Sequence, residues 1–177
     1  DFDDPAASEA RFRERLDDAS HEVNLSLRTQ IARTLGLRGQ FAQAHQLLDG
    51  VDAELAGTGA EPRVRSLLER GRLWRSAREP AKAQPLFMQA VQQARAAGLD
   101  NLHVDALHMV ALVETTPDAQ LDWNRRALAA ARASADPQAR RWEASLSHNI
   151  GYTLHEAGRH EEALQAFRDA LAARLRD

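Results

Sequence analysis

The sequence contains no cysteine, and this absence excludes two kinds of chemistry. Without thiols the chain has no disulfide framework and no thiolate chemistry. Long hydrophobic runs are missing too, since no stretch approaches the roughly 18 apolar residues of a membrane-spanning helix, and no signal peptide is visible. These absences favour a cytoplasmic protein with no membrane partner.

A basic excess is also missing. The formal net charge is -3 at pH 7 over 177 residues, whereas domains dedicated to nucleic acid usually carry a clear surplus of basic residues. We therefore expect no nucleic-acid partner. Lysine occurs only as Lys82, and together with abundant alanine and arginine this suggests a GC-rich bacterial source. The chain begins with Asp1 rather than methionine, so we expect a piece of a longer protein.

Strand-forming sequence is scarce, and helix-forming residues dominate. Alanine, leucine, arginine, glutamate and glutamine are abundant, and all favour helix. Apolar residues recur at spacings of three and four, as in Leu164, Phe167 and Leu171. Glycine and proline interrupt these patterns and divide the chain into segments of roughly 12 to 20 residues. The sequence therefore predicts an all-α fold.

One pattern of small and large residues recurs along the predicted helices with spacings of 3, 4, 5, 4 and 3. Its copies are Ala32, Leu35, Gly39, Ala44, Leu48 and Val51; then Gly71, Trp74, Arg78, Ala83, Phe87 and Ala90; and finally Gly151, Leu154, Gly158, Ala163, Phe167 and Ala170. Only the second copy departs, with Arg78 where the others place a turn glycine. The pattern resembles the tetratricopeptide repeat.

This resemblance implies an α-solenoid of about four antiparallel helix pairs in a right-handed superhelix. We expect an array over residues 22–177, with repeats at about 25–58, 64–97, 100–133 and 144–177. Residues 1–21 would form an N-terminal helix that either caps the first repeat or is the remnant of an earlier one. The steps between repeats exceed the common period of about 34 residues, which resembles long-helix arrays of bacterial regulators and kinesin-light-chain-like scaffolds.

The third repeat fits the pattern worst. Either Ala106 or Ala111 offers a small residue in its first helix, and neither gives the standard spacing. The register of that helix therefore stays open.

The spacing has a packing rationale. A small residue on the first helix of a pair, such as Gly71 or Gly151, lets the second helix approach closely. We expect Phe87 and Phe167 to fill the seam towards the next repeat. A glycine at the end of the first helix, as at Gly158, suits a left-handed backbone.

The stretch HEAGRH, residues 155–160, could suggest a metal site. A zinc protease motif needs two histidines four residues apart on one helix face, whereas His155 and His160 are five apart and Gly158 lies between them. No G-x-S-x-G motif and no glycine-rich phosphate loop occurs either. We assign no catalytic residue, no metal and no cofactor, and expect that the chain is not an enzyme.

In tetratricopeptide proteins the first helices line a concave groove that is the usual ligand site. Counting the small residue as position 8, the resemblance implies that positions 2, 5, 6, 9, 12 and 13 face this groove. The third repeat cannot be counted in this way, and its best candidates are Asp105 and His108, which are three residues apart and share a helix face. The selected candidate residues are Arg33, Arg65, Glu69, Arg72, Asp105, His108, His148, Asn149, Tyr152 and His155.

These side chains suggest a protein-protein interaction scaffold that binds a peptide or helix with acidic character, because arginine forks bind carboxylates. Chaperone-binding relatives hold a C-terminal acidic motif with a carboxylate clamp, which has lysine or arginine and asparagine at positions 5 and 9 of one repeat. This clamp is not reproduced, since the first repeat has Thr29 and Arg33 there. The alternative function is a sensor module of a larger bacterial regulator that binds a small molecule or signalling peptide. Self-association through exposed end helices is a third option.

Overall fold

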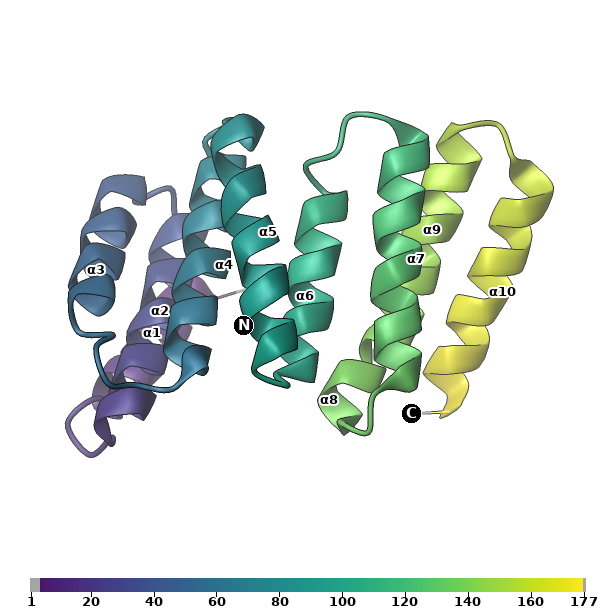
Figure 1. The fold of residues 1–177 in the computed structure, drawn as a ribbon. Coiled ribbons are helices and arrows are strands. Elements are labelled where there is room, and N and C mark those ends of the chain that lie inside the picture. The colour runs from purple at the N-terminus through teal and green to yellow at the C-terminus, as the bar shows by residue number, and fades with distance from the viewer. Residues whose placement is uncertain (1–3, 177) are drawn as a thin grey trace. The chain divides into compact units, whose positions relative to one another are not determined.

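The computed structural model describes residues 4–176, and within this range all regular structure is helical (Figure 1). The all-α prediction is therefore confirmed. The helices are α1 (Pro5–Glu14), α2 (His21–Leu37), α3 (Phe41–Ala53), α4 (Ala60–Ser76), α5 (Pro80–Ala96), α6 (Asp100–Ala111), α7 (Pro117–Ala133), α8 (Pro137–Arg140), α9 (Trp142–Glu156) and α10 (His160–Arg176).

The chain divides into two compact units, Asp1–Gln93 and Ala94–Asp177. In unit 1, α2 packs against α1, α3 and α4, and α3 also contacts α4. In unit 2, α7 packs between α6 and α9, and α9 packs against α10 (Figure 1). Each unit is thus built from neighbouring helices that are close in the sequence.

Three of the helix pairs turn through a left-handed residue. Gly39 and Gly158 both have φ 74°, as predicted, and Arg78 takes the same region with φ 63°. In each turn the next amide donates to a carbonyl of the preceding helix, as from Arg159 N to Leu154 O over 2.9 Å. A side chain in this region costs about 1–2 kcal/mol, so Arg78 keeps the turn at the expense of strain.

The small residues allow close approach of the two helices of a pair, as predicted. A Cβ atom at Gly151 would lie 2.7 Å from Cε1 of Phe167, and one at Gly71 would overlap the ring of Phe87. The predicted packing of the two phenylalanines towards the next repeat stays a prediction. Each ring covers the glycine of its own pair, because the missing Cβ leaves room for it there.

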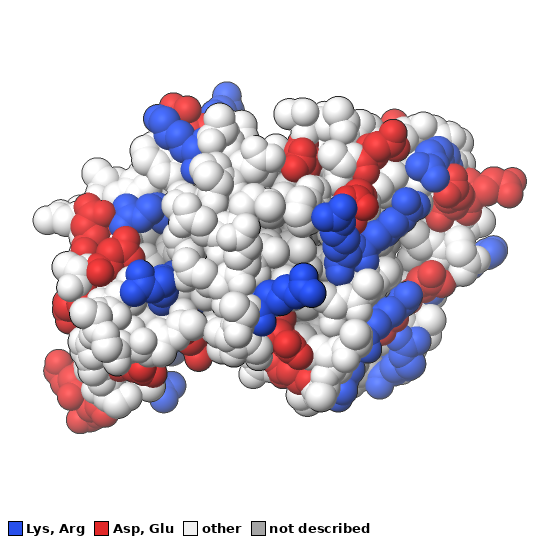
Figure 2. Space-filling view, in the orientation of Figure 1, with Lys and Arg blue, Asp and Glu red and all other residues white. Residues whose placement is uncertain are grey.

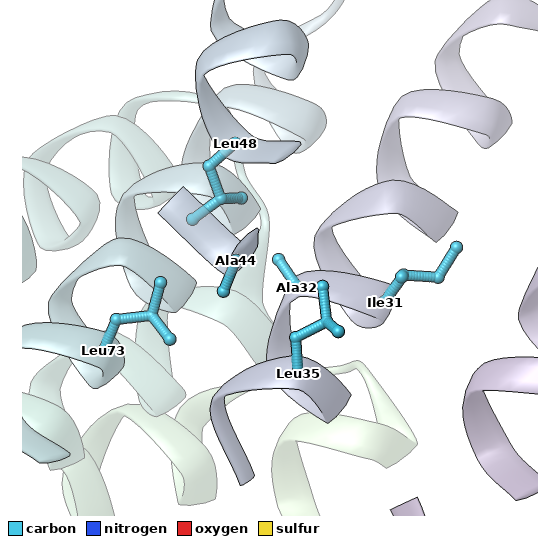
Figure 3. Close-up of a cluster of buried hydrophobic side chains, with 6 residues drawn as sticks. All are labelled: Ile31, Ala32, Leu35, Ala44, Leu48 and Leu73. Atoms are coloured by element: carbon cyan, nitrogen blue, oxygen red, sulfur yellow. The ribbon is translucent and has the colours of Figure 1, made fainter. Parts of the chain in front are cut away.

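The core of unit 1 is a cluster of buried aliphatic side chains from α2, α3 and α4 (Figure 3). Phe12 and Leu16 of the N-terminal segment pack against it, so α1 shields the outer side of α2. The cluster consists of Ile31, Ala32, Leu35, Ala44, Leu48 and Leu73. Leu73 belongs to α4, and the cluster therefore joins the first pair to the helix that follows it.

The structure settles the register of the third pair. Ala32, Gly71 and Gly151 each precede the last residue of their helix by five residues, and Ala106 stands in the same relation to the end of α6. Ala106 is fully buried. The turn after α6 spans residues 112–116, two residues longer than the turns of the other pairs. This longer turn shifts the second helix and hides the repeat spacing.

Candidate functional site

The first helices of unit 1 hold three of the predicted residues in one ion cluster. Glu69 is only 4% exposed and accepts from Arg72 Nη1 at 2.6 Å and from Arg33 Nη1 at 3.4 Å. A buried carboxylate needs such partners, since leaving it unpaired is strongly unfavourable. Arg33 and Arg72 therefore stabilise Glu69, and this carboxylate is not presented to a ligand.

Arg65, one helical turn earlier on α4, is placed differently. Its guanidinium donates to Glu61 at 2.8 Å, an i,i+4 pair in which the Glu61 side chain is 46% exposed. Exposed pairs of this kind contribute about 0.3–0.5 kcal/mol. A ligand carboxylate can therefore compete with Glu61 for Arg65.

Arg65 is one of the residues that line a cleft of about 320 Å³ between α2 and α4. Val23, Leu27 and Pro62 supply its apolar surface. Ser26 and Gln30 add uncharged donors and acceptors to the lining. Glu22 and Glu61 complete the lining. An apolar surface with a few polar groups around it is the usual composition of a ligand site.

A second depression, of about 560 Å³, lies where α1, α2 and α3 meet. Its arginines already have carboxylate partners: Arg38 and Arg13 contact Glu9 at 2.8 Å, and Arg28 contacts Glu54 at 2.8 Å. The sequence reasoning missed this depression, because it needs side chains from three segments with no common motif.

In unit 2 one of the two predicted residues of α6, His108, contacts other helices. His108 Nδ1 lies 3.3 Å from Asn124 Oδ1 of α7, and its ring centroid lies 5.6 Å from that of Trp142 at the start of α9. Asp105 is half-buried on the same helix. The His108 side chain therefore packs against α7 and Trp142 rather than lying on an open surface.

The predicted residues of α9 lie at or near the surface beside α10. Tyr152 is 58% exposed, His148 stacks near Phe167 with ring centroids 5.4 Å apart, and His155 stacks near His160 at 5.1 Å. Asn149 is half-buried, and its carbonyl accepts from Thr153. In unit 2 the predicted residues of α9 are therefore more exposed than those of α6.

One histidine outside the prediction is perturbed. Burial lowers the pKa of His45 on α3, and the nearby Arg70 lowers it further, while Asp49 acts in the opposite direction. The ring lies 4.7 Å from that of Trp74 on α4. The lowered pKa of His45 is therefore a consequence of its burial and charge environment where α3 packs on α4.

Within residues 4–176 no group of three or more histidine, aspartate or glutamate side chains could hold a metal ion. In the same range no helix combines the length and the apolar character that crossing a membrane requires. Acidic and basic side chains are interspersed on the face shown in Figure 2.

No protein-family model and no curated protein matches the sequence. Solved structures do match. BtubC (BKLC) from P. vanneervenii gives a TM-score of 0.74 at 15% identity, over 97% of this chain and 74% of that one. A putative kinesin light chain from Podosopora anserina with nearly identical TPR-like repeats gives 0.62 at 18% identity, over 96% and 84%. A variant of that protein gives 0.63 with the same identity and coverage.

The class of protein follows from the helix pairs and from these matches together. The chain is an all-α solenoid of tetratricopeptide-like repeats. At these identities the likeness concerns the fold alone. Folds of this class generally serve as scaffolds for protein interactions, and their binding surfaces have to be found in the individual chain.

Proposed function

We propose that the chain is a non-enzymatic scaffold that binds a peptide segment of a partner protein in the cleft between α2 and α4. The single observation that supports this most is the cleft itself, whose apolar surface is formed by Val23, Leu27 and Pro62. It lies on first helices of neighbouring pairs, which is where repeats of this class bind their ligands. The alternative, a sensor module for a small molecule, would use the same cleft and stays a prediction.

The lining defines the chemistry of the peptide. Val23 is 50% exposed, so an apolar side chain of the ligand would cover it and gain burial free energy of roughly 25 cal/mol per Å². A carboxylate next to this anchor would replace Glu61 at Arg65. The acidic character expected of the ligand thus rests on Arg65, because Arg33 and Arg72 already hold Glu69.

The experiment is selection of peptides from a displayed library against the whole chain. Selected peptides should share an apolar residue close to a carboxylate. Val23→Asp should weaken them at least about tenfold, because it places a charge on the apolar surface of the cleft. Arg65→Ala should weaken only peptides that carry the carboxylate. Fluorescence anisotropy with labelled peptides measures both effects.

A matched control is available on the same helix. Leu37 is 48% exposed at the other end of α2, and it lies outside the lining of the cleft. Leu37→Asp should leave binding unchanged. Peptides whose affinity is unaffected by Val23→Asp and Arg65→Ala would show that the cleft is not the site.

A further inference from the structure

The last helix pair carries an exposed apolar surface outside the cleft. Its members are Tyr152 on α9, which is 58% exposed, and Leu164, Leu171 and Leu175 on α10, which are 52%, 60% and 79% exposed. The small residues of α10 face inward instead, since Ala163 and its neighbours on that side are buried. We call these four residues the α9–α10 surface.

The first helix pair shows how such a surface is used inside this fold. The repeat pattern aligns α2–α3 with α9–α10 without a gap, and the helix boundaries agree: α2 ends at Leu37 and α9 at Glu156, while α3 begins at Phe41 and α10 at His160. Residues 142–172 of the last pair therefore have counterparts in the first pair, whereas Leu175 lies beyond the end of the aligned helices.

In unit 1 the corresponding surface is covered by α4. Leu73 packs on Gly36, where a Cβ atom would lie 2.5 Å from its Cδ2. Trp74 stacks near His45. Arg70 then binds Asp49 at 2.8 Å. A helix that covers this surface therefore contributes an apolar contact, a ring contact and a charge opposite to the one it meets.

Arg70 also reaches a second carboxylate. It contacts Asp52 at 2.9 Å, and Ser66 donates to Asp52 at 2.6 Å. The first pair thus presents a polar, acidic edge to the helix that covers it.

The last pair changes the chemistry at the same positions. Leu164 stands where the first pair has His45, Leu171 where it has Asp52, and Tyr152 where it has Arg33. At the position of Asp49 the last pair has Arg168, which reverses the sign of the charge. The surface is therefore more apolar than its counterpart and carries a cation where the counterpart carries an anion.

We propose that the α9–α10 surface binds an amphipathic helix of a partner protein in the manner of α4, with a carboxylate of that helix facing Arg168. Apolar side chains of the partner helix cover Tyr152, Leu164 and Leu171. Helix-in-groove recognition of this kind places its contacts at positions i, i+3, i+4 and i+7.

Charge decides between this occupant and a second copy of the chain. In a symmetric pair of α10 helices packed through Leu164 and Leu171, the two Arg168 side chains would meet near the two-fold axis. Like charges so placed disfavour association. A helix such as α4, with Arg70, would bring the same sign to Arg168. A partner helix with a carboxylate at that point meets neither obstacle.

The test uses the whole chain and a labelled peptide derived from the 17 residues of α4. Four changes in the peptide match it to the surface: Ser66→Leu, Glu69→Leu, Arg70→Glu and Leu73→Ala, the last because His155 replaces Gly36. A control peptide has the other three changes and retains Arg70. Since short isolated helices are marginal in water, both peptides carry the same staple on the face away from the contact.

Fluorescence anisotropy should show saturable binding of the acidic peptide and at least tenfold weaker binding of the control peptide. Arg168→Glu in the protein should reverse this preference, and Leu171→Glu should abolish binding of both. Arg63, an exposed arginine on α4, provides the matched control, and Arg63→Glu should change nothing. Val23→Asp should change nothing either, which separates this surface from the cleft.

Two results would overturn the proposal. One is that neither peptide binds, or that binding does not depend on the charge at position 168. The other is found by sedimentation equilibrium of the chain alone. If the chain forms a dimer that Leu171→Glu dissociates and Leu37→Glu does not, a second copy covers the surface.

Discussion

Units 1 and 2 use the same helix-pair geometry and leave different side chains at the surface. In each unit a glycine of a first helix lies under a phenylalanine of the second, Gly71 under Phe87 and Gly151 under Phe167. In unit 1 that phenylalanine is fully buried, whereas Phe167 is half-buried. The repeat pattern therefore sets which residues pack together inside a pair. How far neighbouring elements bury these residues determines how much each one contributes to the stability of the fold.

The largest expected effect comes from truncating these two rings. Phe87→Ala should reduce the free energy of unfolding by about 3–5 kcal/mol, as for other buried phenylalanines. Phe167→Ala should cost less, because part of its ring already contacts water and less apolar area is lost from the interior. Urea denaturation of both variants measures the difference. Equal losses would mean that Phe167 is as well enclosed as Phe87.

The next effect comes from filling the space under the rings. Gly71→Ala should destabilise by about 1–3 kcal/mol through overpacking, and Gly151→Ala should cost less because Phe167 has room to move. The first pair combines alanine with leucine, Ala32 with Leu48. Adding Phe167→Leu to Gly151→Ala recreates that combination and should recover the loss. A double-mutant cycle that shows simple additivity would contradict this coupling.

The sequence predicts most turn and small-residue positions, but not the register of the third pair. The sequence predicts the roles of Gly158 and Gly151, because one backbone conformation and one close contact leave few alternatives to glycine. The register of α6 was not predictable, since the pattern assumes a turn of fixed length and the turn after Ala111 is longer. Only the helix ends revealed Ala106 as the small residue.

The candidate site was harder to predict than the fold. Helix periodicity places Glu69, Arg65 and Tyr152 on the first helices, but it does not say which side chains pair with one another. Glu69 is buried by its arginines, while Arg65 and Tyr152 stay accessible. The cleft beside Val23 depends on the distance between α2 and α4, which no local motif encodes.

The third prediction concerns the left-handed turn residues, where two substitutions should change the free energy of unfolding in opposite directions. Gly158→Ala should destabilise unit 2 by about 1–2 kcal/mol, because φ is 74° there. Arg78→Gly should stabilise unit 1 by up to about 1 kcal/mol, since relief of strain is partly offset by the greater freedom of glycine in the unfolded chain. Thermal and urea unfolding measure both. A loss of stability in Arg78→Gly would show that the Arg78 side chain contributes more than its backbone costs.

The smallest effect concerns pH and distinguishes His45 of unit 1 from its counterpart Leu164. Because burial and Arg70 lower the pKa of His45, the unfolded chain binds the proton more readily than the folded one. Stability is therefore complete above the ordinary histidine pKa of about 6.5 and falls as the pH drops from there to the lower folded value. His45→Leu should remove this part of the pH dependence of urea unfolding. The reciprocal Leu164→His should add none, because that position is exposed and its histidine would be solvated in both states. A pH profile that His45→Leu leaves unchanged would mean that protonation of His45 does not oppose the packing of α4 on α3.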